Sequence, residues 1–310
     1  MPYRSFFGAL WEIFKMIPMD DRDGFIWFDG KLVPWRDAKT HVLTHGLHYG
    51  SSVFEGVRCY GGQIFELTRH NERLANSAKL LGFSLPYTTA ELDKACKEVV
   101  AANGFMDAYV RPVAYRGSEQ MGVSAQQSKI HVAIASWEWP SYFSPELREK
   151  GIKLTFSKWR RPSPDTAPTA SKAAGLYMIC TLSKHAAEAE GWHDALMLDY
   201  RGQLAEATGA NLFLIKDGVI HTPTPDCFLN GITRQTVMAL AAKRGIKVIE
   251  RAMFPEELAT ADEIFLTGSA AEVTAVGQIA DYHYAVGPIT RQLRDDYEAL
   301  VRQPAKSQAA

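Results

Sequence analysis

A single lysine stands among small residues in the stretch Thr169–Tyr177, between the proline-rich segment 161–164 and a periodic segment that predicts a helix over about 173–190. Desolvation and the positive end of a helix dipole both lower the pKa of a lysine in such a place. A lysine with a lowered pKa is suited to forming a Schiff base with a carbonyl compound. Although most lysines are solvated surface residues, Lys172 is the leading candidate for a reactive group.

Other stretches supply groups that could act with Lys172 on one ligand. Glu206 offers a carboxylate and Arg58 offers a cation, while Gly231-Ile232-Thr233 and Gly268–Ala271 offer backbone amides at a helix start and a strand end. Amides at a helix N-terminus bind phosphate groups. An amine, a carboxylate, a cation and anion-binding amides are together the groups that pyridoxal 5'-phosphate (PLP) requires. We therefore expect PLP as the cofactor.

With these motifs in this order, the chain resembles the class IV (fold type IV) PLP-dependent aminotransferases, and most closely the branched-chain amino acid aminotransferases. The resemblance extends from about Gly24 to Val301. It implies an α/β (α+β) fold with a smaller N-terminal α/β domain and a larger C-terminal pseudo-barrel domain. The expected division is residues 1–138 with an arm at 1–23, a linker at 139–150, and residues 151–310 with a tail at 303–310.

The resemblance also implies a role for each candidate residue. Lys172 would hold the cofactor aldehyde and move the substrate proton, Glu206 would face the ring nitrogen, and Tyr177 would face the ring phenolate. The cofactor set implied in this way is Arg58, Lys172, Tyr177, Glu206, Leu229, Gly231, Ile232, Thr233 and Ser269. The substrate set is Tyr49, Phe54, Gly56, Tyr109, Arg111, Trp139, Tyr142, Ser269 and Ala270.

The implied reaction exchanges the amino group between leucine, isoleucine or valine and 2-oxoglutarate. Arg111 matches the family residue that receives the side-chain carboxylate of glutamate. Two positions depart from the common family pattern, since Ser269 stands where threonine is usual and Ala210 where an acidic residue often precedes Asn211. Two alternatives stay open: a class IV aminotransferase for D-amino acids or amines, and a PLP-binding protein without catalysis.

The composition is that of an ordinary globular protein. The chain has 310 residues, of which 46% are hydrophobic and 22% charged, with a formal net charge of −1. A near-neutral chain without a basic run is not expected to bind nucleic acid or an anionic membrane. The four cysteines form no C-x-x-C pair, which favours reduced thiols in the cytoplasm. By family resemblance we expect a homo-oligomer, a dimer or a multiple of dimers.

Local signals predict the elements that must position these residues. Asp29-Gly30 predicts a hairpin over 25–35, Thr68 a helix start, and Thr88 with Glu91 a capping box. Further strands are expected at 109–115, 130–137, 152–157, 194–199, 211–215, 247–250 and 263–266, and helices at 233–244 and 288–302. Glycines interrupt the helical pattern around His41, His45 and His48, so no metal site is expected there.

Overall fold

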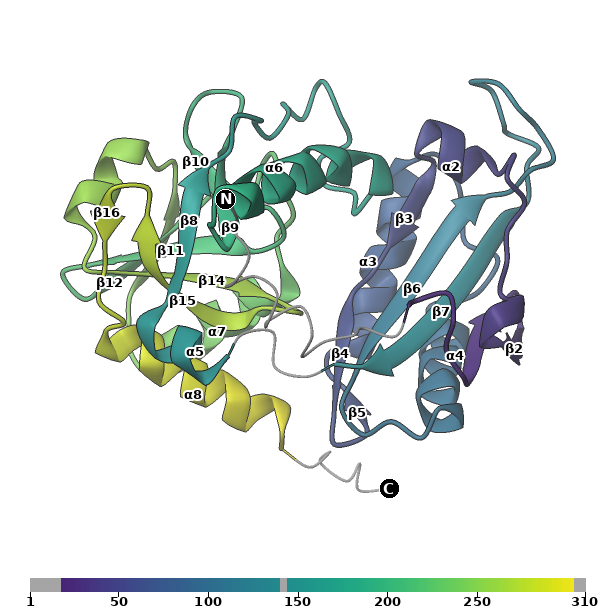
Figure 1. The fold of residues 1–310 in the computed structure, drawn as a ribbon, viewed down its shortest axis with the longest axis horizontal. Helices are drawn as coiled ribbons and strands as arrows, with labels where there is room; N and C mark the ends of the chain where they lie inside the picture. The colour runs from purple at the N-terminus through teal and green to yellow at the C-terminus, as the bar shows by residue number, and fades with distance from the viewer. Residues whose placement is uncertain (1–17, 140–143, 304–310) are drawn as a thin grey trace, which may run out of the picture.

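The computed structural model describes residues 18–139 and 144–303, which form two separate β-sheets with helices packed against each (Figure 1). The first sheet is antiparallel and runs in the order β2-β1-β7-β6-β4-β5, with β3 paired to β6. Its strands are β1 (Phe25–Phe28), β2 (Lys31–Pro34), β3 (Ser52–Phe54), β4 (Val57–Tyr60), β5 (Gln63–Ile64), β6 (Ala108–Arg116) and β7 (Ile130–Glu138). Two short helices, η1 (Trp35–Asp37) and α2 (His45–Tyr49), connect β2 to β3.

Helices α3 (Leu67–Leu80) and α4 (Thr89–Ala102) cover one face of this sheet and share a core with it (Figure 1). The predicted capping box is confirmed, because Thr88 Oγ1 accepts from the Glu91 amide and Glu91 accepts from the Thr88 amide. The expected cap of α3 is wrong. Thr68 lies inside the helix and donates to Asp93 at 2.5 Å, while Glu66 occupies the cap position.

The second sheet closes on itself. Its order is β10-β9-β8-β15-β14-β11-β12-β13, with β16 paired to β15, and β10 also pairs with β11. This extra pairing joins β8, β9, β10, β11, β14 and β15 into a ring, which is the expected pseudo-barrel. The strands are β8 (Ile152–Phe156), β9 (Asp194–Leu198), β10 (Leu204–Ala207), β11 (Asn211–Lys216), β12 (Val219–Pro223), β13 (Val248–Arg251), β14 (Glu263–Gly268), β15 (Glu272–Ile279) and β16 (Tyr282–His283).

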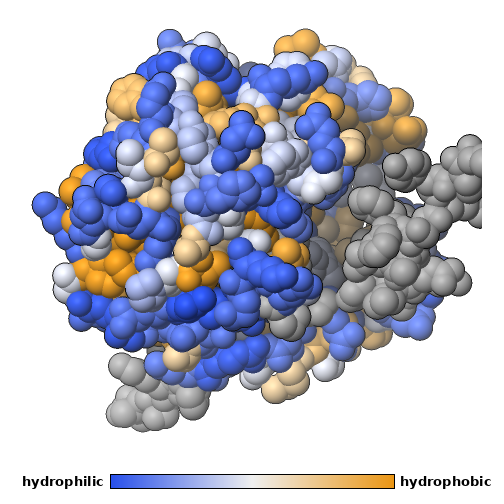
Figure 2. Space-filling model, turned by 60° about the vertical axis from the view of Figure 1, so that its left-hand side comes forward, coloured by the Kyte–Doolittle hydropathy of each residue, from blue (hydrophilic) through white to orange (hydrophobic). Residues whose placement is uncertain are grey.

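The helices of this second part surround the barrel. They are α5 (Pro145–Lys150), η2 (Ala174–Tyr177), α6 (Met178–Ala189), α7 (Ile232–Lys243), η3 (Pro255–Thr260) and α8 (Pro288–Val301). Apolar residues of α7 and α8 pack with Phe213 and Phe265, whose rings stack at 4.7 Å. The face of the molecule in Figure 2 is mainly hydrophilic, with apolar side chains in separate groups. None of the described helices is both long and apolar enough to cross a membrane.

Two expected segments differ from the structure. The helix predicted over 173–190 begins as a 3-10 turn, and the α-helix proper starts only at Met178. The expected linker 139–150 contains helix α5, which packs near β15. Most of the expected N-terminal arm and tail lie outside the described residues. We propose the boundary between the two units within 139–150, because β7 ends at Glu138 and β8 begins at Ile152.

Candidate active site

One cavity of the described structure brings together the two groups on which the predicted chemistry depends. Lys172 and Glu206 both line it, although they come from a connecting segment and from strand β10. The other predicted cofactor residues on its wall are Tyr177, Leu229, Gly231, Ile232, Thr233 and Ser269. Several residues that the sequence did not indicate line it as well, among them Arg73, Arg161, Asn211 and Thr267.

The side chain of Lys172 extends toward Tyr177. Its Nζ donates a hydrogen bond to the Tyr177 hydroxyl at 2.8 Å and lies 4.9 Å from the centre of the Phe54 ring. Burial lowers the pKa of Lys172. The expected contribution of a helix dipole is not supported, because α6 begins at Met178 and the dipole effect falls off within one turn. Desolvation is therefore the main cause of the lowered pKa.

Glu206 is only 8% exposed, and its carboxylate has two polar neighbours. Asn211 Nδ2 donates to Glu206 Oε2 at 3.1 Å, and Arg161 Nε lies 3.5 Å from Glu206 Oε1. Burial raises the pKa of Glu206 to about 7, against the opposite influence of Arg161 and Lys172. A carboxyl with this pKa becomes fully ionised when a cationic group is placed beside it.

Asn211 connects this carboxylate to the start of α7. The same Nδ2 donates to the Leu229 carbonyl at 3.0 Å, and Asn211 Oδ1 accepts from the Gly231 amide at 3.2 Å. A Cβ on Gly231 would lie 2.2 Å from Asn211 Oδ1, so this N-cap position requires glycine. Thr233 follows in the first turn of α7 and is 3% exposed. The helix therefore presents its N-terminal amides and a hydroxyl to the cavity.

Arg58, the predicted cation of this site, does not line the cavity. It lies on β4 with its Nη1 3.9 Å from Glu272 and its guanidinium over the Tyr60 ring. The guanidinium that reaches the cavity wall from the first sheet's side is Arg73 of α3. Arg73 forms two hydrogen bonds to the fully buried Glu55, at 2.6 and 2.8 Å. Arg73 is therefore a second candidate cation for the phosphate beside the predicted Arg58, whose buried Nε has no hydrogen-bond partner among the described residues.

The sequence did contain a signal for Arg73. Helix α3 buries Leu74 and Ala78 against the sheet, yet His70 and Ser77 are buried on the same side of this helix. Polar residues among the apolar positions of an amphipathic helix are expected to have buried partners. His70 Nδ1 lies 2.7 Å from Glu55 Oε2, so the helix and Glu55 form one polar cluster. Arg73 belongs to this cluster.

The predicted substrate residues cluster beside Lys172. The Arg111 guanidinium lies 4.7 Å from the Phe54 ring centre and 5.2 Å from that of Tyr109, and its Nη2 is 3.3 Å from the Tyr109 hydroxyl. Phe54 contacts Tyr177 edge to face at 4.8 Å. The Trp139 ring lies 5.0 Å from that of Tyr109. The rings of Phe54, Tyr109 and Trp139 therefore form an aromatic wall next to the Lys172 amine, and this wall carries the guanidinium of Arg111.

Gly56 and the turn after β14 complete this side. A Cβ on Gly56 would lie 1.8 Å from the Tyr109 hydroxyl, so any larger residue would displace that tyrosine. Ser269 lines the cofactor cavity, and Ala270 lines the adjoining groove with Tyr177. Tyr49 is 47% exposed on α2 and stacks on His45. Tyr142 lies outside the described residues.

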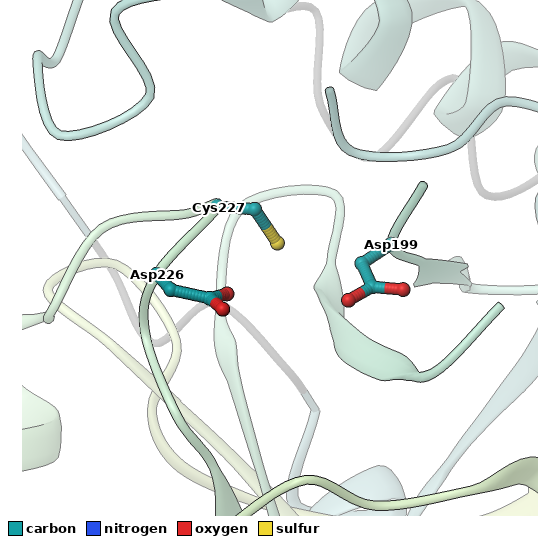
Figure 3. Close-up of side chains that lie close together, drawn as sticks. All are labelled: Asp199, Asp226 and Cys227. Atoms are coloured by element: carbon teal, nitrogen blue, oxygen red, sulfur yellow. The ribbon is translucent and has the colours of Figure 1, made fainter. Parts of the chain in front are cut away.

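One group of described residues has the spacing of metal ligands: Asp199, Asp226 and Cys227, whose ligand atoms lie within 4.8 Å of one another (Figure 3). The Arg201 guanidinium lies between the two carboxylates, with Nη2 2.6 Å from Asp199 and 2.8 Å from Asp226. Burial raises the pKa of Cys227 to about 12, and the Arg201 cation already pairs with both carboxylates. The group is an ion pair beside a buried thiol.

The residues of the cavity fit PLP, both in the chemical groups that they offer and in a buried hydroxyl that has no hydrogen-bond partner among the described residues. The cavity combines an amine, a buried carboxylate, a helix N-terminus and the guanidinium of Arg73. Thr267 Oγ1 lies on its wall, is buried and has no hydrogen-bond partner among the described residues. Buried hydroxyls are rarely left without a partner, so a ligand oxygen is expected there. Lys172 would hold the aldehyde end and the α7 terminus the phosphate end.

Comparison with known proteins supports this interpretation. The family model "Amino-transferase class IV" matches residues 52–279. The branched-chain-amino-acid aminotransferase of Pseudomonas aeruginosa is 43% identical over 94% of this chain and 97% of its own length. The crystal structure of the Escherichia coli branched-chain amino acid aminotransferase has a TM-score of 0.88 at 38% identity, covering 93% of this chain and 98% of that one.

A further solved structure, a branched-chain amino acid aminotransferase complexed with N-(5'-phosphopyridoxyl)-L-glutamate, matches with a TM-score of 0.86 at 40% identity, covering 91% of this chain and 96% of that one. The chain belongs to the class IV aminotransferases, and the predicted family is confirmed. Within that family, its similarity to branched-chain amino acid aminotransferases extends over almost the whole chain.

Proposed function

We propose that this protein is a PLP-dependent transaminase that moves the amino group between branched-chain L-amino acids and 2-oxoglutarate, giving branched-chain 2-oxo acids and L-glutamate. The observation that carries the proposal is the junction of two surfaces at Lys172. On one side lies the cavity shared with Glu206, and on the other lies the aromatic wall with Arg111. The names of the relatives from Pseudomonas aeruginosa and Escherichia coli support the same substrate class.

Lys172 is proposed as the catalytic residue. When bound, PLP supplies an aldehyde for amines and an electron-withdrawing ring that stabilises a carbanion at the substrate Cα. Lys172 would provide the amine that holds this aldehyde and would then move the proton at Cα, and burial lowers its pKa in the direction that both tasks need. The Tyr177 hydroxyl, at 2.8 Å, orients that amine. Glu206 would face the ring nitrogen and hold a proton on it.

The phosphate is proposed to bind at the start of α7. The amides of Ile232 and Thr233 and the Thr233 hydroxyl lie at a helix N-terminus, where a dianion is stabilised. Arg73 on the cavity wall and Arg58, as predicted from the sequence, are the candidate cations for this phosphate. Ser269 and Ala270 offer further groups in the turn after β14, next to the substrate side.

The substrate side chain is proposed to lie along Phe54, Tyr109 and Trp139. These rings can enclose an aliphatic chain, and Arg111 at their edge can pair with the side-chain carboxylate of glutamate. The guanidinium lies over two rings, so it is accessible to a carboxylate without being exposed as a free charge in the aliphatic part of the pocket.

Comparison of amino donors tests the substrate class. L-Leucine, D-alanine and a chiral primary amine should each be assayed with 2-oxoglutarate, following glutamate formation. We expect kcat/KM for L-leucine to exceed the others by at least about 100-fold, because only its side chain fills the aromatic pocket while its carboxylate is bound. Preference for D-alanine or the amine would favour the alternative class IV reactions. Protein that stays colourless after PLP is added would favour a non-enzyme.

Replacement of Arg111 by leucine separates the two kinds of substrate. Loss of a charge-assisted interaction should raise KM for 2-oxoglutarate and L-glutamate by about 10- to 100-fold. The single-turnover rate with L-leucine should change by less than about threefold, since that substrate carries no side-chain charge. Arg36→Leu is a suitable control, because Arg36 is half-exposed and pairs only with Asp21 and Asp23 among the described residues. Equal losses for leucine and glutamate would contradict the assignment.

We also propose a homodimer or a multiple of dimers. Helix α2 and the loop after β6 lie together, since His45 Nε2 is 2.9 Å from the Gly122 carbonyl. Apolar side chains of α2, of the segment just before it and of this loop are exposed: Val42 at 70%, Leu47 at 65%, Tyr49 at 47%, Met121 at 44% and Val123 at 89%. Such a patch is expected to be covered in solution. A monomer in sedimentation experiments, or a dimer unaffected by charges at Leu47 and Val123, would contradict this interface.

A cytoplasmic location is proposed from the cysteines. Cys59, Cys96, Cys180 and Cys227 are free and buried. Unpaired thiols persist in a reducing compartment. Cell fractionation that recovers the protein outside the cytoplasm would contradict this location.

A further inference from the structure

The main chain around Lys172 is anchored on the first sheet and its helix rather than on the barrel that carries Glu206. The Lys172 amide donates to Ser77 Oγ of α3 at 3.0 Å, and the Ser171 hydroxyl donates to the Ser77 carbonyl at 3.0 Å. On the other side, the Phe54 amide donates to the Lys172 carbonyl at 3.1 Å. The lysine peptide therefore lies between α3 and strand β3.

The residues that make these contacts are buried from solvent. Ser77 has no exposed surface and Ser171 has 1%. A buried amide that loses its acceptor is left with the full penalty of desolvation, because water cannot replace the missing partner. The hydroxyl of Ser77 is the hydrogen-bond partner of the Lys172 amide, so one side chain of α3 holds the N–H side of this residue, while the Phe54 amide holds its carbonyl.

Lys172 is therefore held by other elements than Glu206 and the start of α7. Glu206 and Thr233 belong to the barrel and its helix α7, whereas the lysine backbone is held by α3 and β3. The lysine side chain lies against the Phe54 ring, 4.9 Å from its centre, and is hydrogen-bonded to the Tyr177 hydroxyl at 2.8 Å, which leaves it little room to compensate for a shift of its Cα. An error at the Cα is therefore passed on to the amine, and misplacement of a reacting group by about 1 Å is costly in catalysis.

We propose that Ser77 is a positioning residue for Lys172: it fixes the lysine main chain from α3 and so places the amine where it can join the cofactor aldehyde. This inference rests on the proposed function. The competing explanation is that Ser77 is an ordinary buried serine that stabilises the fold as a whole. The two differ in one respect, since a positioning residue affects only events in which the lysine takes part.

The experiment compares two ligands of the apoprotein carrying Ser77→Ala. PLP can join Lys172, whereas pyridoxamine 5'-phosphate has the same ring and phosphate but an amine in place of the aldehyde. We expect the dissociation constant for PLP to rise about tenfold, while that for pyridoxamine 5'-phosphate stays within about twofold of the wild-type value. Equal weakening of both ligands, or no weakening of either, would overturn the proposal.

A matched control is Ser136→Ala. Ser136 is also fully buried and bonds to the Val99 carbonyl at 3.4 Å and to Asn103 Nδ2 at 3.1 Å, on a strand of the same sheet. The Ser136→Ala substitution should lower the free energy of unfolding without changing the ratio of the dissociation constants for PLP and pyridoxamine 5'-phosphate. If Ser77→Ala does not fold, Ser77→Cys decides, since it keeps the shape but is a poor acceptor; we expect the ratio to rise about threefold.

Failure of the proposed function would look different. Wild-type protein that binds PLP no more tightly than pyridoxamine 5'-phosphate, and retains no label after borohydride reduction, would count against Lys172 as the cofactor lysine. In that case the role of Ser77 would fall with it. A wild type that captures PLP, together with an unchanged ligand ratio in Ser77→Ala, would overturn the role of Ser77 alone.

Discussion

Lys172→Ala should lose transamination between L-leucine and 2-oxoglutarate by at least about 1,000-fold in kcat/KM. The amine of Lys172 is the group that would hold the cofactor aldehyde and move the Cα proton, and alanine can do neither. The structure gives the amine a hydroxyl partner at 2.8 Å and an aromatic neighbour in a site that excludes much of the solvent. Glutamate formation under steady-state conditions measures the loss, and borohydride reduction followed by mass spectrometry should detect no covalently attached cofactor.

Lys216→Ala is the control for this variant. Its amine is part-exposed and pairs with Asp262 at 3.5 Å, at the hairpin between β11 and β12. It should keep wild-type activity and wild-type cofactor labelling. If Lys172→Ala retained more than about a tenth of the activity, a different lysine or a different chemistry would have to be assigned.

The elements that the sequence predicted correctly depend on local chemistry. Asp29 and Gly30 have positive φ angles of 46° and 97°, as a two-residue hairpin turn requires. Thr88 and Glu91 form the capping box within one turn of helix. By contrast, β10 was not predicted, because all four of its residues are buried and no alternation of apolar and polar residues marks it. Glu206 was nevertheless identified, through its motif and the resemblance.

The predicted site was incomplete where it depends on tertiary contacts. Lys172 and Glu206 were expected to share a cavity, and they do. Arg73 was missed, although its helix carried a signal, because only the packing of α3 against the rest of the protein brings it to the cavity wall. Ser77 and Lys172 are 95 residues apart, and neither carries a motif that points to the other. Such pairs follow from the fold rather than from spacing.

Glu206→Gln should reduce kcat for L-leucine by at least about 100-fold, with a smaller effect on KM. Glutamine is close in shape to glutamate and can keep an oxygen acceptor for Asn211, but it cannot carry the negative charge that would hold a proton on the ring nitrogen. The expected loss is therefore electrostatic. Glu250→Gln is a control in the same unit, since Glu250 pairs with Arg234 outside the cavity. Wild-type kcat in Glu206→Gln would contradict the assigned role.

The same variant should change how the stability of the apoprotein depends on pH. Burial raises the pKa of Glu206 to about 7 from an ordinary value of 4.5, so the folded state binds the proton more tightly than the unfolded chain. This contribution to stability is complete below about pH 4.5 and is lost as the pH rises through about 7. Glutamine does not titrate, so the variant does not lose this contribution. As the pH rises across this window, the free energy of unfolding of Glu206→Gln should therefore increase by about 3 kcal/mol relative to that of the wild type. Urea unfolding of both apoproteins between about pH 5 and about pH 8 measures most of this gain. A constant difference would mean that the Glu206 carboxylate is already ionised in the apoprotein, and that its charge is stabilised by Arg161 and Lys172 rather than by the ligand.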